Sequence, residues 1–179
     1  MKALWTVPVL VLGASIACAQ TSAPDKAPSK QSSIMPSARH VSGDPSPGLA
    51  TSTHDVQWGP APDVLPSGAE VAVLQGNPFA PTGNYTLRLK MPNGYTVGPH
   101  CHPHDEIVTV IQGNLIFGMG DHINRAETTT LHNGGLVNAA QGVHHYVIAQ
   151  GETIVQVDGL APFQISYLKD GPCPWAPQP

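Results

Sequence analysis

Two histidines and a carboxylate, residue types that bind transition metals, fall close together in the segment GYTVGPHCHPHDEIVTVIQG, residues 94–113. His100, His102 and Glu106 are separated by even intervals. Side chains two residues apart on a strand project to the same face, so extended structure would point these three in one direction. Pro103 predicts a bend that lets Glu106 swing back toward the imidazoles. The spacing therefore predicts a site for one divalent transition metal.

Neighbouring residues leave several interpretations open. His104 shares the parity of the ligands but follows a proline, so it is either a pocket residue near the metal or an exposed loop side chain. Tyr85 is a second candidate pocket residue. Cys101 should face away from the ligands, and an oxidising compartment would permit a disulfide with Cys173. Such a bridge needs Cα atoms within about 7 Å, which the sequence does not fix.

The elements that must position these residues are short apolar runs separated by Gly, Pro, Asn and Asp, a pattern typical of an all-β sandwich or barrel. The sequence predicts strands over 71–74, 85–91, 107–111, 115–119, 128–131, 136–139, 145–149, 153–157 and 163–168. Gln112, Gly113 and Asn114 predict a hairpin turn. Val108 should continue the ligand face, and Ile107 and Ile111 should line the other face.

The spacing also resembles the first conserved motif of the cupin superfamily. The matching anchor positions are Gly94, His100, His102, Glu106 and Gly113. A second segment resembles the second cupin motif, with matches at Gly134, Gly142 and His145. Two positions depart from the motif, since Ala140 replaces a usual proline and Ala149 a frequent asparagine. The resemblance is to small single-domain bacterial secreted cupins with an HxHPHDE core.

That resemblance implies a fold and a fourth ligand. The expected fold is an all-β, single-domain cupin β-barrel of the jelly-roll type, with two antiparallel sheets. By the same resemblance His145 completes the ligand set of His100, His102 and Glu106. His144 should then point to the opposite face of the strand. A homodimer is possible on family grounds, and outward Ile107 and Ile111 are compatible with it.

The predicted ligand set suits iron, manganese, nickel, copper or zinc, and the residues do not select among them. The resemblance implies dioxygenase, isomerase or decarboxylase chemistry, or no reaction at all. Aliphatic residues share the ligand face, so only His104, Tyr85 and Tyr146 are candidate proton carriers. A dioxygenase needs such a carrier least. Dioxygenase-type chemistry is therefore the first expectation, with a non-catalytic metal or ligand binder, acting as sensor or scavenger, as the alternative.

The chain divides into a leader and one domain. Residues 1–19 read as a secretory signal peptide cleaved after Ala19, which predicts a periplasmic or secreted protein; lipidation at Cys18 is the second interpretation. Residues 20–53 are rich in Pro, Ser and Ala and are expected to be disordered. Residues 54–171 form the barrel and residues 172–179 a C-terminal tail.

The net charge limits the classes of molecule that the protein is expected to bind. The formal net charge is −4, and acidic residues outnumber basic ones in the predicted barrel. Nucleic acid is therefore an unsuitable partner, since its binding rests on clustered Lys and Arg. The apolar run of the signal is too short to span a membrane. The expected partner is a small-molecule ligand or substrate.

Overall fold

The computed structural model describes residues 52–176. The predicted signal peptide, residues 1–19, and nearly all of the predicted leader, residues 20–53, lie outside the described residues and stay predictions. The strands are β1 (Gly59–Pro60), β2 (Glu70–Gln75), β3 (Asn84–Met91), β4 (Thr96–Cys101), β5 (Glu106–Met119), β6 (Thr128–Leu131), β7 (Leu136–Ala139), β8 (His145–Leu160) and β9 (Ser166–Tyr167). Three short 3-10 helices span Thr53–Asp55, Arg125–Glu127 and Leu168–Asp170.

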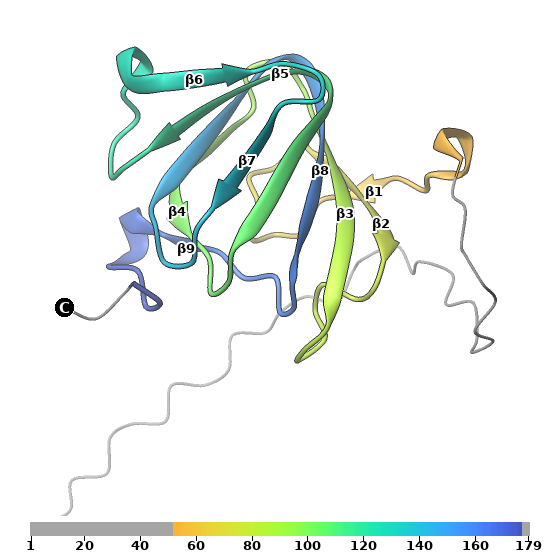
Figure 1. The fold of residues 1–179 in the computed structure, drawn as a ribbon, viewed down its shortest axis with the longest axis horizontal. Helices are drawn as coiled ribbons and strands as arrows, with labels where there is room; N and C mark the ends of the chain where they lie inside the picture. Colours follow the sequence, from red (N-terminus) through yellow and green to blue (C-terminus); the bar gives the residue numbers. More distant parts are fainter. Residues whose placement is uncertain (1–51, 177–179) are drawn as a thin grey trace, which may run out of the picture. The chain divides into compact units, whose positions relative to one another are not determined.

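Two long strands, β5 and β8, organise the barrel and pair antiparallel along almost their whole lengths (Figure 1). The second half of β8 pairs with β3, β3 pairs with β2, and β2 pairs with β1. The first half of β5 pairs with β7. The first half of β8 pairs with β4, which pairs with β9, and the second half of β5 pairs with β6. The predicted all-β antiparallel barrel is confirmed. Its two sheets are halves of one curled, hydrogen-bonded sheet, because β5 and β8 run through both.

The predicted hairpin at residues 112–114 is wrong. β5 is continuous, and its register against β8 shifts between Val110 and Asn114. Gly113 has a φ of +80°, and a Cβ there would lie 2.3 Å from the carbonyl oxygen of Glu152. The glycine therefore serves a bulge at which two strands cross closely, and not a reversal of the chain.

Two other strand predictions need correction. The predicted strands 145–149 and 153–157 are both parts of β8, which continues through the glycine that was expected to separate them. The predicted strand 163–168 is reduced to Ser166–Tyr167, followed directly by a 3-10 helix. Predicted strands 128–131 and 136–139 have the observed bounds of β6 and β7.

The apolar core fills the inside of the barrel. On β5, Val108 and Val110 are 5% and 1% exposed, whereas Ile107 and Ile111 are 40% and 38% exposed. This alternation is the one predicted from strand parity. Tyr85, Leu87, Leu89 and Met91 of β3 are likewise buried. Val108, Leu87, Leu89 and Met91 also line the cavity described below.

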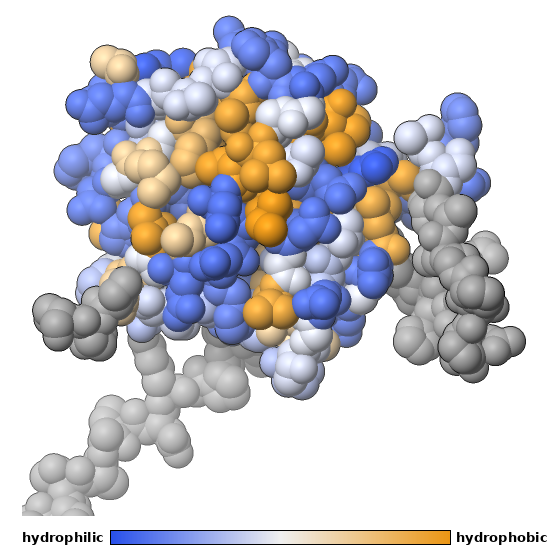
Figure 2. All heavy atoms as spheres, viewed as in Figure 1, coloured by the Kyte–Doolittle hydropathy of each residue, from blue (hydrophilic) through white to orange (hydrophobic). Residues whose placement is uncertain are grey.

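Apolar side chains also lie on the outside. The exposed large hydrophobic residues include Ile107, Ile111 and Leu136 of β5 and β7. Figure 2 shows apolar patches among polar surface on the face seen in Figure 1. The homodimer stays a prediction. In the described part of the chain, no helix is long and apolar enough to cross a membrane.

Candidate metal centre

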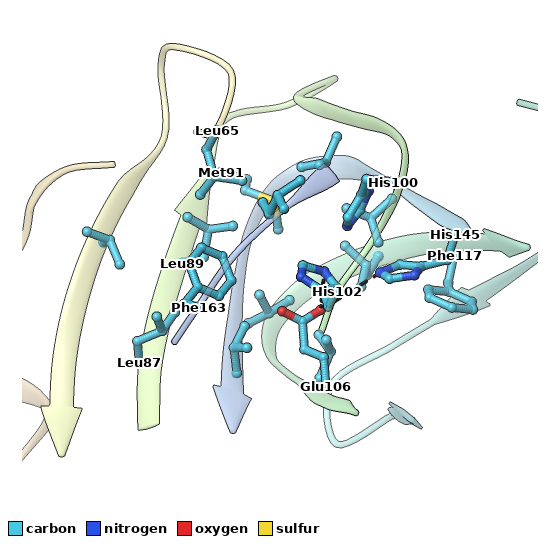
Figure 3. A pocket seen from close by; sticks show the side chains of 18 of the residues that line it. Leu65, Leu87, Leu89, Met91, His100, His102, Glu106, Phe117, His145 and Phe163 are labelled. Atoms are coloured by element: carbon cyan, nitrogen blue, oxygen red, sulfur yellow. Dashed lines mark ion pairs between the residues drawn. The ribbon is translucent and has the colours of Figure 1, made fainter. Parts of the chain in front are cut away.

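Three histidines meet inside the barrel (Figure 3). His100 on β4 and His145 on β8 are directly paired in register, and His102 follows the end of β4. Their side chains are almost fully buried, and their ring centroids lie 4.2 to 5.2 Å apart. One nitrogen from each histidine lies within 4.8 Å of one nitrogen of the other two. This buried group of imidazoles can hold a metal ion.

Backbone carbonyls orient all three rings. Nδ1 of His100 lies 2.7 Å from the Gly98 oxygen, Nδ1 of His102 lies 2.7 Å from the Gln164 oxygen, and Nδ1 of His145 lies 3.1 Å from the Val143 oxygen. A carbonyl only accepts hydrogen bonds, so each Nδ1 carries the proton and each Nε2 keeps its lone pair. A second hydrogen bond of this kind usually fixes the tautomer of metal-binding histidines.

An unpartnered atom supports the fit of a metal. Nε2 of His102 is buried and has no hydrogen-bond partner among the described residues. Buried polar atoms without partners cost free energy and are rare, so this nitrogen calls for a ligand. A divalent cation accepting the lone pair would satisfy it.

Glu106, at the start of β5, lies beside two of the three histidines. Its Oε2 is 3.5 Å from Nε2 of His102 and 3.9 Å from Nε2 of His145 (Figure 3). The bend at Pro103 that brings it there is present. The group whose ligand atoms all lie within 4.8 Å of one another contains the histidines alone. The structure thus places Glu106 next to the histidines, and its role as a fourth ligand stays a prediction.

The surroundings favour the neutral form of two of the imidazoles, those of His100 and His145. Burial lowers the pKa of His100 well below its usual value, and the neighbouring His145 and His102 lower it further. Burial also lowers the pKa of His145, although the charge of Glu106 acts in the opposite direction. Neutral imidazole is the form that binds a metal, so the site is prepared for one at neutral pH.

The histidines face an apolar cavity of about 50 Å³. A single water needs about 10 to 15 Å³, so this cavity admits a ligand of only a few atoms without rearrangement. Within residues 52–176, the polar side chains lining it are the three histidines and Glu106 (Figure 3). The remaining lining is Pro62, Leu65, Val71, Leu87, Leu89, Met91, Val97, Val108, Leu115, Phe117, Val147, Val155, Val157, Phe163 and Ile165.

The predicted pocket residues His104 and Tyr85 line a second, smaller hollow of about 10 Å³, which shares His102 and Glu106 with the main cavity. Burial raises the pKa of Tyr85 well above its usual range, and the charges of Glu106 and Asp158 add to that effect. Tyr85 therefore stays protonated and cannot act as a base near neutral pH.

The hydroxyl of Tyr146, the third candidate proton carrier, donates to the Asn124 carbonyl oxygen at 3.0 Å and accepts from the Asn124 N–H at 2.9 Å. Its ring packs closely against Gly118, where a Cβ would lie 2.1 Å from the ring. Tyr146 is therefore part of the framework of the barrel and does not face the cavity.

Sequence reasoning missed the segment that covers the cavity. Pro62 and Leu65 precede β2 and line the cavity. The Tyr167 hydroxyl donates to the Val64 carbonyl oxygen at 3.0 Å, and the Tyr95 hydroxyl donates to the Pro66 carbonyl oxygen. No local pattern in this segment predicts that it lines the cavity. Its position depends on hydrogen bonds from Tyr95 and Tyr167, which are distant in the sequence.

The cysteine pairing that the sequence left open is resolved by the fold. Cys101 and Cys173 are joined by a disulfide, with Cα atoms 6.2 Å apart. Cys101 is fully buried on the side of β4 opposite to His100, as strand parity predicted. The disulfide ties the C-terminal tail to the strand that carries the ligands.

Comparisons with known proteins agree with this architecture. The cupin domain family profile matches residues 87–160. A proposed acetylacetone dioxygenase from Methylibium petroleiphilum PM1 is 15% identical, with a TM-score of 0.55, and the match covers 73% of this chain and 88% of that one. KdgF from Halomonas sp. is 23% identical, with a TM-score of 0.49 and coverage of 65% and 96%. A search of curated proteins gave no match. At 15% identity, the likeness to the Methylibium protein bears on the fold alone.

Proposed function

Since the chain belongs to the cupin superfamily and carries a buried group of three histidines, we propose that it is a small-molecule metalloenzyme of dioxygenase type. The observation that carries the proposal is the convergence of His100, His102 and His145 on an apolar cavity. We assign one divalent transition metal to these histidines, with Glu106 as the fourth ligand. Iron, manganese, nickel, copper and zinc all suit this set.

The residues that line the cavity determine the role of each part of the proposed site. A bound transition ion supplies Lewis-acid polarisation and, where it is redox-active, one-electron chemistry with oxygen. The three carbonyl-anchored imidazoles hold their Nε2 atoms in place, and Glu106 contributes the negative charge of the site. The aliphatic walls exclude water, which strengthens the interaction of these charges with a substrate.

The absence of another acid or base in the cavity lining, among the described residues, favours this class of reaction. Isomerases and decarboxylases usually need a positioned proton carrier. His104, Tyr85 and Tyr146, the three candidate carriers, do not line the main cavity. The cavity volume points to a small, largely apolar substrate whose oxygen atoms face the histidines. The name of the Methylibium neighbour makes a β-diketone a reasonable first compound to test.

The same lining supports one other function. A cavity whose polar groups are all expected metal ligands also fits a non-catalytic module that holds a metal or a small ligand. The two functions differ in turnover. An enzyme consumes oxygen in proportion to substrate, whereas a binding module only saturates.

Oxygen uptake by the separately loaded iron, manganese, nickel, copper and zinc forms tests the proposal. Small β-diketones, catechols and hydroxy acids serve as candidate substrates. We expect at least one redox-active form to consume oxygen only when substrate is present, and the His102→Ala variant to lose this activity. Saturable binding without oxygen uptake in any form would favour the binding module. Substrate conversion without oxygen uptake would favour an isomerase or decarboxylase.

A further inference from the structure

A second group of metal-binding side chains lies on the other side of the ligand strand. Cys101, Cys173 and His144 bring two sulfur atoms and one imidazole nitrogen to within 4.8 Å of one another. Cys101 alternates with His100 and His102 on the chain, and His144 immediately precedes His145. None of these three residues takes part in the centre inside the cavity. The proposal below therefore does not depend on the proposed function.

His144 is prepared to act as a ligand. Its Nδ1 lies 2.7 Å from Oδ1 of Asp121, and an ionised carboxylate oxygen only accepts hydrogen bonds, so Nδ1 is the donor. Asp121 is itself held near by the Gly120 N–H, which donates to the His144 carbonyl oxygen at 2.9 Å. A carboxylate on one imidazole nitrogen is a common arrangement when the other nitrogen binds a metal.

The other nitrogen of His144 has no use in the disulfide form. Nε2 is buried and has no hydrogen-bond partner among residues 52–176. A buried polar atom left without a partner costs free energy. The disulfide sulfurs near this imidazole are poor acceptors, but the thiols that replace them on reduction become strong metal ligands once they lose their protons. One nitrogen of His144 lies within 4.8 Å of both sulfurs, and Nε2 is the nitrogen that Asp121 leaves without a partner.

We propose that Cys101, Cys173 and His144 form a redox-gated site for a thiophilic d¹⁰ cation, zinc(II) or copper(I). In the oxidised protein the disulfide closes the site. A dithiol reductant breaks the Cys101–Cys173 bond by transferring two electrons, becomes a disulfide itself, and leaves one proton on each cysteine sulfur. The cation then binds both sulfurs and Nε2 of His144, and the two thiol protons pass to solvent.

The geometry allows this change with a small movement. Two thiolates on one tetrahedral ion, each at about 2.3 Å, lie about 3.8 Å apart. The Cα separation of 6.2 Å is compatible with both a disulfide and a shared ion. Cys173 lies in the tail after β9, outside any strand, so the tail can give the needed space. Cys101 and His144 stay fixed by the barrel.

Cobalt(II) titration of the full chain tests the site, because thiolate-to-cobalt charge-transfer absorption arises only from sulfur ligation. The protein is reduced with a dithiol, freed of it by anaerobic gel filtration, and titrated beside the oxidised protein. We expect the absorption to saturate at one cobalt per chain in the reduced protein and to be absent in the oxidised one. Zinc(II) and copper(I), added separately, should each bleach it.

Two variants complete the test. His144→Ala should weaken cobalt binding at the thiolates at least tenfold, whereas His132→Ala, whose ring bonds to Asn114 away from the cluster, should not change it. No charge-transfer absorption in the reduced wild type would overturn the proposal. Absorption of unchanged affinity in His144→Ala would also overturn it, because cobalt would then be bound by the sulfurs alone or by an unfolded chain.

Discussion

The two faces of one stretch of barrel wall carry two different groups of ligands. His145 lines the cavity, whereas the adjacent His144 does not and lies within 4.8 Å of the two cysteine sulfurs. His100 and His102 likewise face the cavity, while Cys101 between them bonds outward to the C-terminal tail. The alternation of successive side chains at the end of β4 and at the start of β8 accounts for this separation. Neighbouring residues with metal-binding side chains can therefore belong to two different sites. The face to which each side chain projects should be worked out before the residues are assigned to one site.

The two groups also differ in what holds them. The Nδ1–H groups of the cavity histidines donate hydrogen bonds to backbone carbonyls, which the barrel fixes. The Nδ1–H group of His144 instead donates to the side chain of Asp121, which is 59% exposed. We therefore expect the inner centre to be permanent and the outer cluster to respond to its surroundings.

The largest expected difference between the two groups comes from removing an inner histidine. His102→Ala should weaken metal binding more than 100-fold, because the loss of a direct ligand exceeds the 10- to 100-fold effect of losing an orienting partner. The neighbouring His104→Ala serves as the matched control. Metal content by elemental analysis, with circular dichroism to confirm the β fold, checks this. Equal metal retention in both variants would refute the assignment of the site.

Removing the disulfide should act on stability and leave the inner metal in place. Cys173→Ser should lower the free energy of unfolding by about 2 to 5 kcal/mol, since the disulfide closes a loop with a sequence separation of 72 residues. Denaturant unfolding of the variant beside the oxidised and reduced wild type measures this. Loss of the inner metal together with stability would show that the two faces are not independent.

Gly142 contacts both the His102 backbone and the C-terminal tail. Its N–H donates to the His102 carbonyl oxygen at 3.0 Å, and a Cβ there would lie 2.3 Å from the Trp175 carbonyl oxygen of the tail. Gly134 has a similarly positive φ with nothing within 4 Å of its Cβ position. Gly142→Ala should therefore cost about 1 to 3 kcal/mol more than Gly134→Ala. Equal losses in thermal unfolding would mean that the tail does not pack on this residue.

Acid should weaken the metal-free protein through the inner histidines. The pKa values of His100 and His145 are lowered in the folded state, so below about pH 6.5 the unfolded chain binds protons that the folded chain does not. Stability should then fall with pH by up to about 1.4 kcal/mol per pH unit for each of these histidines.

Urea unfolding of the metal-free protein between about pH 7.5 and pH 5.5 measures this slope. His145→Gln should reduce it, whereas His132→Ala, which alters an exposed histidine, should not. A stability that does not change over this range would contradict the burial of neutral imidazoles.

The grouping of the inner histidines could be predicted from the sequence because it depends on short spacings. Parity brings His100 and His102 together, the bend at Pro103 brings Glu106 beside them, and His145 follows from the resemblance to the second cupin motif. The hairpin prediction failed because a Gln-Gly-Asn segment suits either a turn or a bulge, and only the crossing of β5 and β8 decides between them. The disulfide and the covering segment at Pro62 and Leu65 depend on contacts between distant residues, which no local pattern specifies.

The most direct test of the central claim compares two variants of adjacent residues, His145→Ala and His144→Ala, in the oxidised protein. Elemental analysis after purification without a histidine tag gives the metal content per chain. The inner centre predicts close to one metal ion in the wild type and in His144→Ala, and almost none in His145→Ala. Equal metal content in the two variants would contradict a metal centre built from the inward face.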